Sequence, residues 1–283
     1  MNIGLLCDSA NGWHVQDLLR AATKLQINLQ VLDYRALQSL NGFSVVYPNP
    51  NPIILVRIMP PGSLEQVIFR MDWLHAQQNS GVKIFNPPKA LEICIDKYLC
   101  LERLERSGIP IPPTICCQTA QQAMEAWENL GKDVVVKPLF GSEGRGMMRV
   151  SDPELAWRTF QTLERLQSIL YLQRFIQHPG WDLRVFVLQG RVLAAMQRMN
   201  AKDWRTNVAQ GGKAIPVSLP KELADLALRA TRASSAIIAG VDLIADELGR
   251  WCVIEVNAVP GWKSLSSVTG IDIATEILQG SSR

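Results

Sequence analysis

Short apolar runs and amphipathic stretches alternate along the first third of the chain. The short runs are typical of buried strands, and they cover residues 3–7, 29–32 and 53–56. Between them, apolar residues recur at helical spacing over residues 13–25 and 62–78. Strands that alternate with helices predict a parallel sheet. Because Asn86-Pro-Pro88 interrupts this pattern, we expect an N-terminal α/β domain over residues 1–86.

The remaining two thirds of the chain mix helices and strands without strict alternation. Helical spacing covers residues 91–107, 120–130, 153–166 and 220–234, and a last helix is expected after Gly270. Strands are expected at residues 114–117, 134–137 and 147–150, and repeatedly between 169 and 199. This order indicates an α+β organisation in the C-terminal part. We divide it into domains over residues 87–168 and 169–283.

A β-hairpin is predicted near the C-terminal end. Two apolar runs, 237–245 and 251–257, flank the turn signal Asp246-Glu-Leu-Gly-Arg250. With Leu248-Gly249 as the two-residue loop, Asp242 pairs directly with Glu255. The neighbouring pairs would be Val241 with Val256 and Leu243 with Ile254.

The polar residues of this hairpin are candidate metal ligands. Asp242, Glu255 and Asn257 would share one face, because side chains alternate along a strand. Two carboxylates placed opposite each other repel, and a hard cation between them would remove that cost. The pattern therefore predicts a site of the magnesium type. A solvated polar face is the alternative, and a shift of one residue would make the acid pair diagonal.

Composition and charge exclude several classes of protein. The 283 residues suffice for more than one domain, and 47% hydrophobic with 19% charged residues is typical of a globular chain. A net charge of +3 is too small to indicate a nucleic-acid partner. The six cysteines form no C-x-x-C pair and the three histidines lie far apart, which argues against a disulfide scaffold or a zinc site. With no apolar run long enough for a membrane span and no basic signal region, we expect a cytoplasmic protein without a membrane partner.

A glycine-rich loop lies between the strands predicted at 134–137 and 147–150. Its residues Gly141, Ser142, Gly144 and Gly146 match neither a Walker A loop nor a Rossmann fingerprint. Such a loop makes a flap whose amides can cover phosphates, although an ordinary turn is the alternative. Lys137 ends the all-valine strand before it. Burying this lysine without an anion is costly, so a phosphate partner is favoured over a surface position.

Three arginines are further candidates for anion chemistry. Arg184 shares one face of an alternating strand with Asp182, and Arg205 precedes a second small-residue loop. Both arginines suit the stabilisation of transferring phosphate charge. Arg57 ends the strand at 53–56, at the edge where open α/β sheets bind ligands, and an arginine can hold a carboxylate bidentately. Ion pairs of purely structural role are the alternative for all three.

Taken in order, these landmarks resemble the RimK-type carboxylate–amine ligases of the ATP-grasp family. The matching segments are Asp96-Lys97, Val135-Val-Lys137-Pro138, the 141–146 loop, Gln173-Arg-Phe-Ile176, Asp182-Leu-Arg184, Arg205-Thr-Asn207, Asp242 and Glu255-Val-Asn257-Ala-Val-Pro-Gly261. The resemblance extends from about residue 86 to the end, and the first 85 residues fit the usual substrate-side domain. It implies an ATP-grasp architecture in which 87–168 and 169–283 are the central and C-terminal subdomains.

The resemblance also implies roles for these residues around ATP and two Mg²⁺ or Mn²⁺ ions. The metals would be held by Asp242, Glu255 and Asn257. Phosphates would contact Lys97, Lys137, the 141–146 loop, Arg205, Thr206 and Asn207. Adenine would lie on the backbone of Arg174 and Phe175, and the ribose on Asp182. Arg174 stands where relatives usually carry Glu, so any side-chain contact from that acid would be lost.

The reaction implied by the resemblance joins an acceptor carboxylate to an amino acid's amine through an acyl phosphate. Glutamate is the commonest amine donor in the family, and the loops at 139–146 and 204–212 look most like the branch that acts on tetrahydromethanopterin. Branches that act on a ribosomal protein C-terminus or on an amino-group carrier protein are alternatives. A hydroxyl kinase and a non-catalytic nucleotide-binding module are alternatives of another class. Relatives are often dimers or tetramers, so a homo-oligomer is also compatible.

Overall fold

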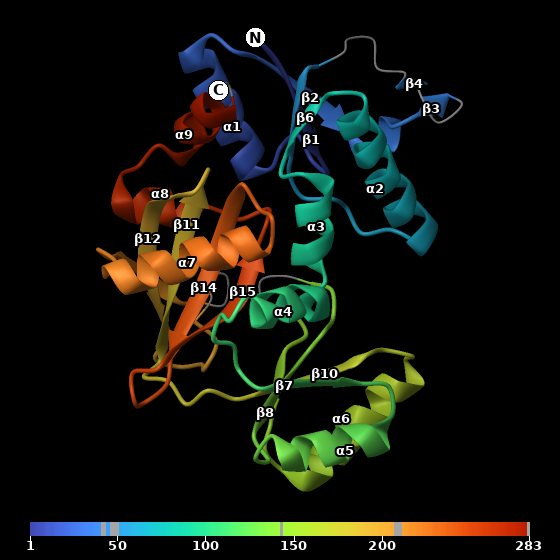
Figure 1. Ribbon diagram of the computed structural model, residues 1–283, viewed down its shortest axis with the longest axis vertical. Helices are drawn as coiled ribbons and strands as arrows, with labels where there is room; N and C mark the ends of the chain where they lie inside the picture. The colour runs from blue at the N-terminus through green and yellow to red at the C-terminus, as the bar shows by residue number, and fades with distance from the viewer. Residues whose placement is uncertain (41–43, 46–50, 142–143, 207–210, 282–283) are drawn as a thin grey trace.

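The computed structural model describes residues 1–40, 44–45, 51–141, 144–206 and 211–281 (Figure 1). Its strands form three main sheets and a short hairpin of β3 (Ser39–Leu40) and β4 (Ser44–Val45). In Figure 1 the first sheet lies at the top, the third in the middle and the second at the bottom. The third sheet thus lies between the first and the second.

The first sheet is parallel, as the alternation of strands and helices predicts. Its order is β2 (Asn28–Asp33), β1 (Asn2–Cys7), β5 (Ile53–Val56) and β6 (Lys83–Phe85). Both faces are apolar because helices cover both. Helix α1 (Trp13–Leu25) packs on the face with Leu5, and α2 (Leu64–Asn79) on the face with Leu6.

The second sheet is antiparallel. Its order is β7 (Thr114–Cys117), β10 (Leu170–Arg174), β8 (Val134–Lys137) and β9 (Met148–Val150). Helices α5 (Ala120–Asn129) and α6 (Pro153–Arg165) supply its core, in which Trp127 and Phe160 are buried. Strand β10 belongs to this sheet although it follows residue 168. The glycine-rich loop connects β8 and β9, two neighbouring antiparallel strands.

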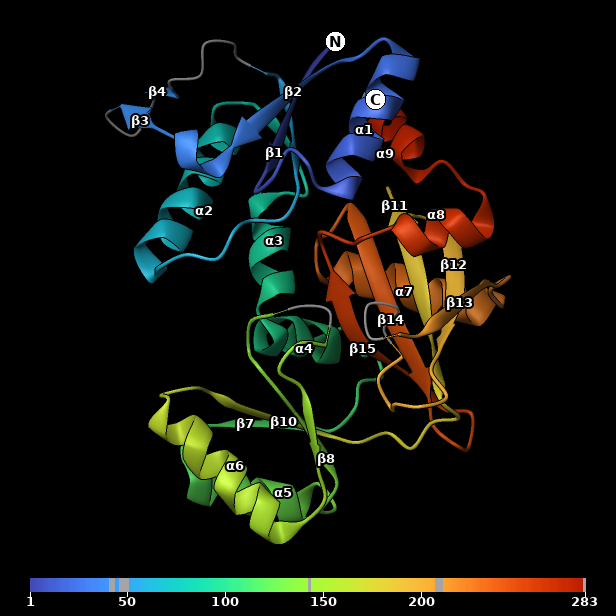
Figure 2. The ribbon, with the colours of Figure 1, turned by 180° about the vertical axis from the view of Figure 1, so that it is seen from behind.

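The third sheet holds the predicted hairpin. Its order is β13 (Lys213–Pro216), β12 (Arg191–Met199), β11 (Trp181–Leu188), β14 (Ile238–Ala245) and β15 (Trp251–Asn257). Helix α7 (Lys221–Ala233) covers one face. The other face shares a core with the first sheet, α8 (Lys263–Thr269) and α9 (Ile273–Ser281). Both ribbon views place α9 beside α1, so the two ends of the chain meet (Figures 1 and 2).

The single helix expected over residues 91–107 is wrong. Two helices, α3 (Pro88–Ile95) and α4 (Lys97–Arg106), meet at Asp96, whose backbone is extended at φ −90° and ψ 104°. The Asp96 carboxylate accepts a hydrogen bond from the Leu99 backbone N–H at 3.0 Å. Aspartate caps a helix better than it continues one, because its side chain competes for backbone hydrogen bonds. The break places Lys97 at the first turn of α4.

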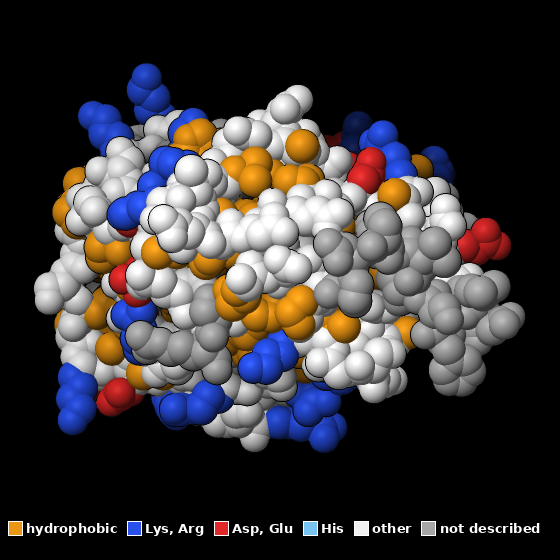
Figure 3. Space-filling model, turned by 90° about the horizontal axis from the view of Figure 1, so that it is seen from above, with side chains coloured by type: hydrophobic (Ala, Val, Ile, Leu, Met, Phe, Trp, Pro, Cys, Tyr) orange, Lys and Arg blue, Asp and Glu red, His pale blue; other side chains and the backbone are white. Residues whose placement is uncertain are grey.

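The upper surface of the molecule is mixed in character (Figure 3). Lys and Arg side chains stand around its rim, and apolar side chains show between polar ones nearer the middle. This scattered positive charge agrees with the modest net charge of +3. Among the described residues, no helix is both long and apolar enough to span a bilayer.

Removing the cap between α3 and α4 should measurably destabilise the protein. We expect Asp96→Ala to lower the free energy of unfolding by about 1 kcal/mol, because the Leu99 N–H loses its acceptor. Asp96→Asn keeps an oxygen acceptor and should stay close to the parent. Urea unfolding followed by circular dichroism measures both, and equal midpoints for the alanine variant and the parent would contradict the capping role.

Candidate active site

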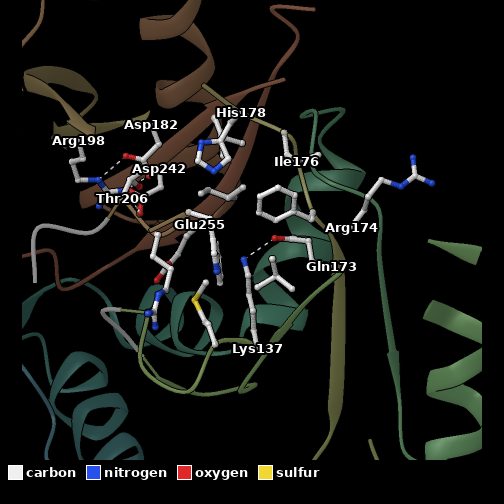
Figure 4. A pocket seen from close by; sticks show the side chains of 18 residues that line it. Lys137, Gln173, Arg174, Ile176, His178, Asp182, Arg198, Thr206, Asp242 and Glu255 are labelled. Carbon is white, nitrogen blue, oxygen red and sulfur yellow. Dashed lines mark hydrogen bonds and ion pairs between the residues drawn. The ribbon is translucent and has the colours of Figure 1, made fainter. Parts of the chain in front are cut away.

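A pocket of about 680 Å³, open to solvent, lies between the second and third sheets (Figure 4). Side chains of both sheets line it, together with the loops that join them. The polar lining residues are Lys137, Gln173, Arg174, His178, Asp182, Arg198, Arg205, Thr206, Asp242 and Glu255. Residues from distant parts of the sequence therefore converge on one cavity.

The β14–β15 hairpin places the predicted acid pair at this pocket. Asp242 lies opposite Glu255, and Val241 opposite Val256, as expected. The expected pair of Leu243 with Ile254 is wrong, because the register shifts between Asp242 and Leu243 and the partner becomes Val253. A bulge of this kind turns a side chain toward a new direction. Ile254 accordingly lines the pocket beside Glu255.

Two arginines compensate the buried Asp242 carboxylate. Arg184 Nε lies 2.6 Å from Asp242 Oδ1, and an Arg198 guanidinium nitrogen lies 3.0 Å from Oδ2. Arg198 also donates two hydrogen bonds to Asp182, at 2.8 and 2.5 Å. Burial alone would lower the pKa of Arg198, but Asp242 and Asp182 outweigh it and raise that pKa. Sequence reasoning missed Arg198; its place opposite Asp182 depends on the pairing of β11 with β12.

The predicted metal ligands offer a donor set that fits a hard cation. Asp242 Oδ1 is buried and, despite its contact with Arg184, accepts no hydrogen bond within the described structure. Asn257 Oδ1 accepts the Val259 N–H at 2.8 Å, which leaves it a second lone pair. In the described part of the chain no three His, Cys, Asp or Glu side chains gather as a metal cluster. Two carboxylates and one amide oxygen are ligands of the type that Mg²⁺ or Mn²⁺ takes. Asp242 and Glu255 line the pocket, whereas Asn257 is not among the lining residues.

Of the two predicted phosphate lysines, Lys137 lines the pocket and Lys97 does not. Lys137 Nζ donates to Gln173 Oε1 at 2.6 Å, and desolvation lowers the pKa of Lys137 to about 8 against the attraction of Glu255. Lys97 Nζ donates to the Gly141 carbonyl at 2.8 Å, at the base of the glycine-rich loop. Desolvation also lowers the pKa of Lys97, and Glu255 opposes it. Both ammonium groups therefore lie in the field of Glu255.

The glycine-rich loop reaches the pocket through Gly144, which is among the lining residues. Gly146 has φ +72°, and a Cβ atom there would lie 3.0 Å from Pro138. A residue with a side chain would be strained there by both the backbone conformation and the contact. Gly141 also has positive φ, at +140°. Ser142 lies outside the described residues.

Aromatic and aliphatic side chains form the apolar part of the pocket lining. Trp204 meets Phe175 edge to face at 5.9 Å, and the Arg149 guanidinium stacks 3.5 Å from the Phe175 ring. Further apolar lining comes from Ile176, Ile244 and Ile254. Sequence reasoning missed Trp204 and His178 as lining residues, since aromatic residues in loops carry no periodic signal. A wall of this composition suits a purine base.

The predicted adenine residues have their backbone donors already engaged. The N–H of Arg174 donates to Pro113 O at 2.8 Å, and that of Phe175 to Asp133 O at 2.9 Å. Any backbone hydrogen bond between these two residues and adenine would therefore be accepted by their carbonyl oxygens. The Arg174 side chain points away from the pocket (Figure 4), and its Nε donates to Leu130 O.

The remaining predicted residues differ in whether they line the pocket. Arg205 and Thr206 line the pocket, and Arg205 forms a close ion pair with Asp203. Asp182 lines it too but is engaged by Arg198, whereas Arg184 touches Asp242 from outside the lining set. Asn207 lies outside the described residues.

Arg57 is not at this pocket. It is buried at the end of β5, donates to Pro260 O at 3.1 Å and stacks on the Trp262 ring at 4.6 Å. Burial lowers its pKa to about 10, so the guanidinium stays charged at neutral pH. A direct role in acceptor binding stays a prediction, and the geometry gives Arg57 a contact with the loop after β15 instead.

Comparison with known proteins relates the chain to ligases. The model of the RimK-like ATP-grasp domain matches residues 94–280. Tetrahydromethanopterin:α-L-glutamate ligase of Methanosarcina acetivorans is 32% identical, with 98% of this chain and 97% of that protein covered. The α-aminoadipate–LysW ligase LysX of Sulfurisphaera tokodaii is 30% identical over 71% of this chain and 72% of that protein.

A solved structure shares the fold. The ATP-grasp ligase PsnB, in complex with a minimal precursor, Mg and ADP, superposes with a TM-score of 0.75 at 17% sequence identity. The match covers 99% of this chain and 98% of that one. The predicted fold class, α/β with an N-terminal parallel sheet and an ATP-grasp architecture, is therefore confirmed.

Lys137 should control nucleotide affinity in a pH-dependent way. A charged phosphate contact contributes on the order of 1.5–3 kcal/mol, so Lys137→Ala should weaken binding of a non-hydrolysable ATP analogue by roughly 10- to 150-fold. Because the pKa of Lys137 in the free protein is about 8, and bound phosphate would raise it, the complex retains a proton that the free protein loses above pH 8. Affinity should therefore fall as pH rises above about 8.

Calorimetric titration between pH 7 and 9.5 measures this effect. Lys83→Ala, at an exposed lysine of β6, is the control and should bind like the parent. If Lys137→Ala binds the ATP analogue as tightly as the parent, Lys137 does not contact the phosphates.

Proposed function

The chain belongs to the RimK-like ATP-grasp family and is an ATP-dependent carboxylate–amine ligase, and we propose that its amine substrate is L-glutamate. The observation that carries this proposal is the pocket lined by Asp242, Glu255, Lys137 and an apolar wall, with Lys97 outside the lining but in the field of Glu255. Support for glutamate comes from the relative in Methanosarcina acetivorans, whose name specifies glutamate ligation and whose match spans nearly the whole chain.

The proposed reaction has two steps. The acceptor carboxylate attacks the γ-phosphorus of ATP, which forms an acyl phosphate and releases ADP. The glutamate amine then attacks the acyl carbon, phosphate leaves, and the amine loses a proton as the amide bond forms. No protein nucleophile is needed for either step.

The residues of the pocket divide this work between them. Lys137 and Lys97 hold the phosphates, with Thr206, Asn207 and the glycine-rich loop, including Ser142, around them. Arg205 and Arg184 stabilise the charge that develops during transfer. Asp242, Glu255 and Asn257 would hold two Mg²⁺ or Mn²⁺ ions, which neutralise phosphate charge when bound. The base lies on the wall around Phe175, with the Arg174 and Phe175 carbonyls in reach, and Asp182 lies near the ribose.

The acceptor is proposed to be an anionic molecule with a free carboxylate, such as a tetrahydromethanopterin-type cofactor. A carrier-protein acceptor is the second candidate, since LysX at 30% identity is named for the ligation of α-aminoadipate and LysW. A ribosomal protein C-terminus is a further acceptor of the same chemistry. The proposed ATP site would be the same for each of these acceptors. Identification of the product is therefore needed to tell which acceptor the enzyme uses.

Glu255→Gln should abolish turnover while the fold survives. The change removes one of two facing carboxylates and keeps the volume of the side chain. Glu247→Gln, in the exposed turn of the same hairpin, is the matched control and should retain activity. Release of ADP, with and without excess chelator, measures the effect. Full activity of Glu255→Gln, or of the parent protein in chelator, would refute the metal site.

The product identifies the substrates. We expect ADP release to depend on L-glutamate together with an acceptor, and mass spectrometry to show the acceptor heavier by one or more glutamates less water each. Candidate acceptors are a pterin cofactor with a terminal carboxylate, an amino-group carrier protein and a ribosomal protein C-terminal peptide. Turnover with α-aminoadipate but not with glutamate would contradict the proposed amine.

Arg57→Ala tests the acceptor side. If Arg57 binds the acceptor carboxylate, the variant should raise the acceptor KM and leave ATP affinity little changed. Steady-state kinetics with each substrate varied in turn separates the two constants. Loss of ATP binding with a normal acceptor KM would exclude direct acceptor binding by Arg57.

A further inference from the structure

The loop after β15 is held by the first domain at every second residue. It covers residues 258–262 and begins directly after the proposed metal ligand Asn257. Asn86 donates to the Ala258 carbonyl, Arg57 donates to the Pro260 carbonyl at 3.1 Å, and His14 Nε2 accepts the Trp262 N–H at 3.0 Å. The three side chains come from different parts of the first domain: His14 lies in α1, Arg57 follows β5 and Asn86 follows β6. Together they hold the backbone of the loop.

Asn86 ties this loop to the strand that carries Asp242. Its Nδ2 also donates to Ile238 O, and its Oδ1 accepts the N–H groups of Ile237 and Ile238 at 2.6 and 2.8 Å. Asn86 is 1% exposed, and these four contacts use its full hydrogen-bonding capacity. One side chain thus sets the spacing between the start of β14 and the end of β15.

The contact with His14 is equally close. A Cβ atom at Gly261 would lie 3.3 Å from the His14 imidazole, and the Trp262 indole Nε1 donates to Asp17 at 2.8 Å. The His14 and Trp262 rings meet edge to face at 4.7 Å. Because His14 Nε2 accepts a hydrogen bond, the ring is neutral and carries its proton on Nδ1.

The loop in turn orients Asn257. Its side-chain oxygen accepts the Val259 N–H at 2.8 Å, so the direction of the carboxamide follows the backbone of the loop. Partners that orient a metal ligand affect metal affinity although they do not touch the metal. The first domain therefore acts on the metal site through this loop.

We propose that Asn86 and His14 are positioning residues that set metal affinity by holding the 258–262 loop and, through it, the Asn257 carboxamide. The inference rests on the proposed role of Asn257 as a metal ligand. It gives the first domain a part in the ATP site besides any part in acceptor binding.

Binding of Mn²⁺ in the presence of ADP, followed by the electron paramagnetic resonance signal of free Mn²⁺, tests the inference. His14→Leu removes the acceptor for Trp262 N–H, and we expect the Kd for Mn²⁺ to rise about 10-fold, as for other partners of metal ligands. Asn86→Asp keeps the acceptor for the Ile237 and Ile238 N–H groups but loses the donors to the Ala258 and Ile238 carbonyls, and it should raise the Kd for Mn²⁺ in the same way. His14→Gln keeps an acceptor and should stay within about twofold of the parent.

Two controls separate positioning from stability. Lys24→Ala removes a contact between α1 and Asp272 without touching the loop, and its Mn²⁺ affinity should be that of the parent. ADP binding in chelator should be unchanged in every variant. Thermal unfolding of each variant shows whether a loss of affinity follows a loss of stability.

The outcomes are distinct. Asn257→Ala should itself weaken Mn²⁺ binding; if it does not, the proposed metal ligand is wrong and the inference fails with it. If Asn257→Ala weakens binding while His14→Leu and Asn86→Asp bind like the parent, the inference alone is wrong. Equal losses in His14→Gln and His14→Leu would also overturn it, because the hydrogen bond would then not be the cause.

Discussion

The buried negative charge of Asp242 is the constraint on which the rest of the site depends. All eight residues of β14 are buried, and an isolated carboxylate there would cost several kcal/mol. Arg184 from β11 and Arg198 from β12 offset that cost by direct contact. Removing one partner of such a buried network typically costs about 3–5 kcal/mol. The alignment of three neighbouring strands is thus tied to the compensation of one carboxylate.

The pocket also holds side chains of both charges close together. The acids Asp242 and Glu255 stand side by side on the hairpin, with arginines against one and lysines facing the other. Phosphate oxygens and a divalent cation entering between them would exchange partners with groups that are already charged and desolvated. The two acids and the two arginines lie on neighbouring strands, so strand register places their charges.

The first domain takes part in this arrangement through packing and hydrogen bonds. Its sheet shares a core with β11, β12 and the last helix, so the domains cannot separate without exposing Phe186 and Trp262. Asn86 adds polar contacts that are fully buried and fully paired. The contact between the first domain and the third sheet is thus both apolar and hydrogen-bonded.

Local patterns in the sequence determined most of the elements and the acid pair. The parallel first sheet, the strands that flank the glycine-rich loop and the pairing of Asp242 with Glu255 follow from periodicity and turn residues close in sequence. The same reasoning failed at two places: it missed the helix break at Asp96 and paired Ile254 with the wrong residue. A helix cap and a β-bulge each depend on a single residue, and a periodic pattern over many residues does not detect them. The roles assigned to individual site residues came from the resemblance and remain predictions.

Only the tertiary structure decided which distant side chains meet. Arg198 reaches Asp182 across 16 residues of sequence, and Asn86 reaches Ala258 across 172. The tertiary structure also shows that Arg57 contacts the loop after β15 and does not line the pocket. Such contacts depend on strand order and on the packing of one domain against another. No local periodicity encodes them, because their energy is gained only when separate elements have already been brought together.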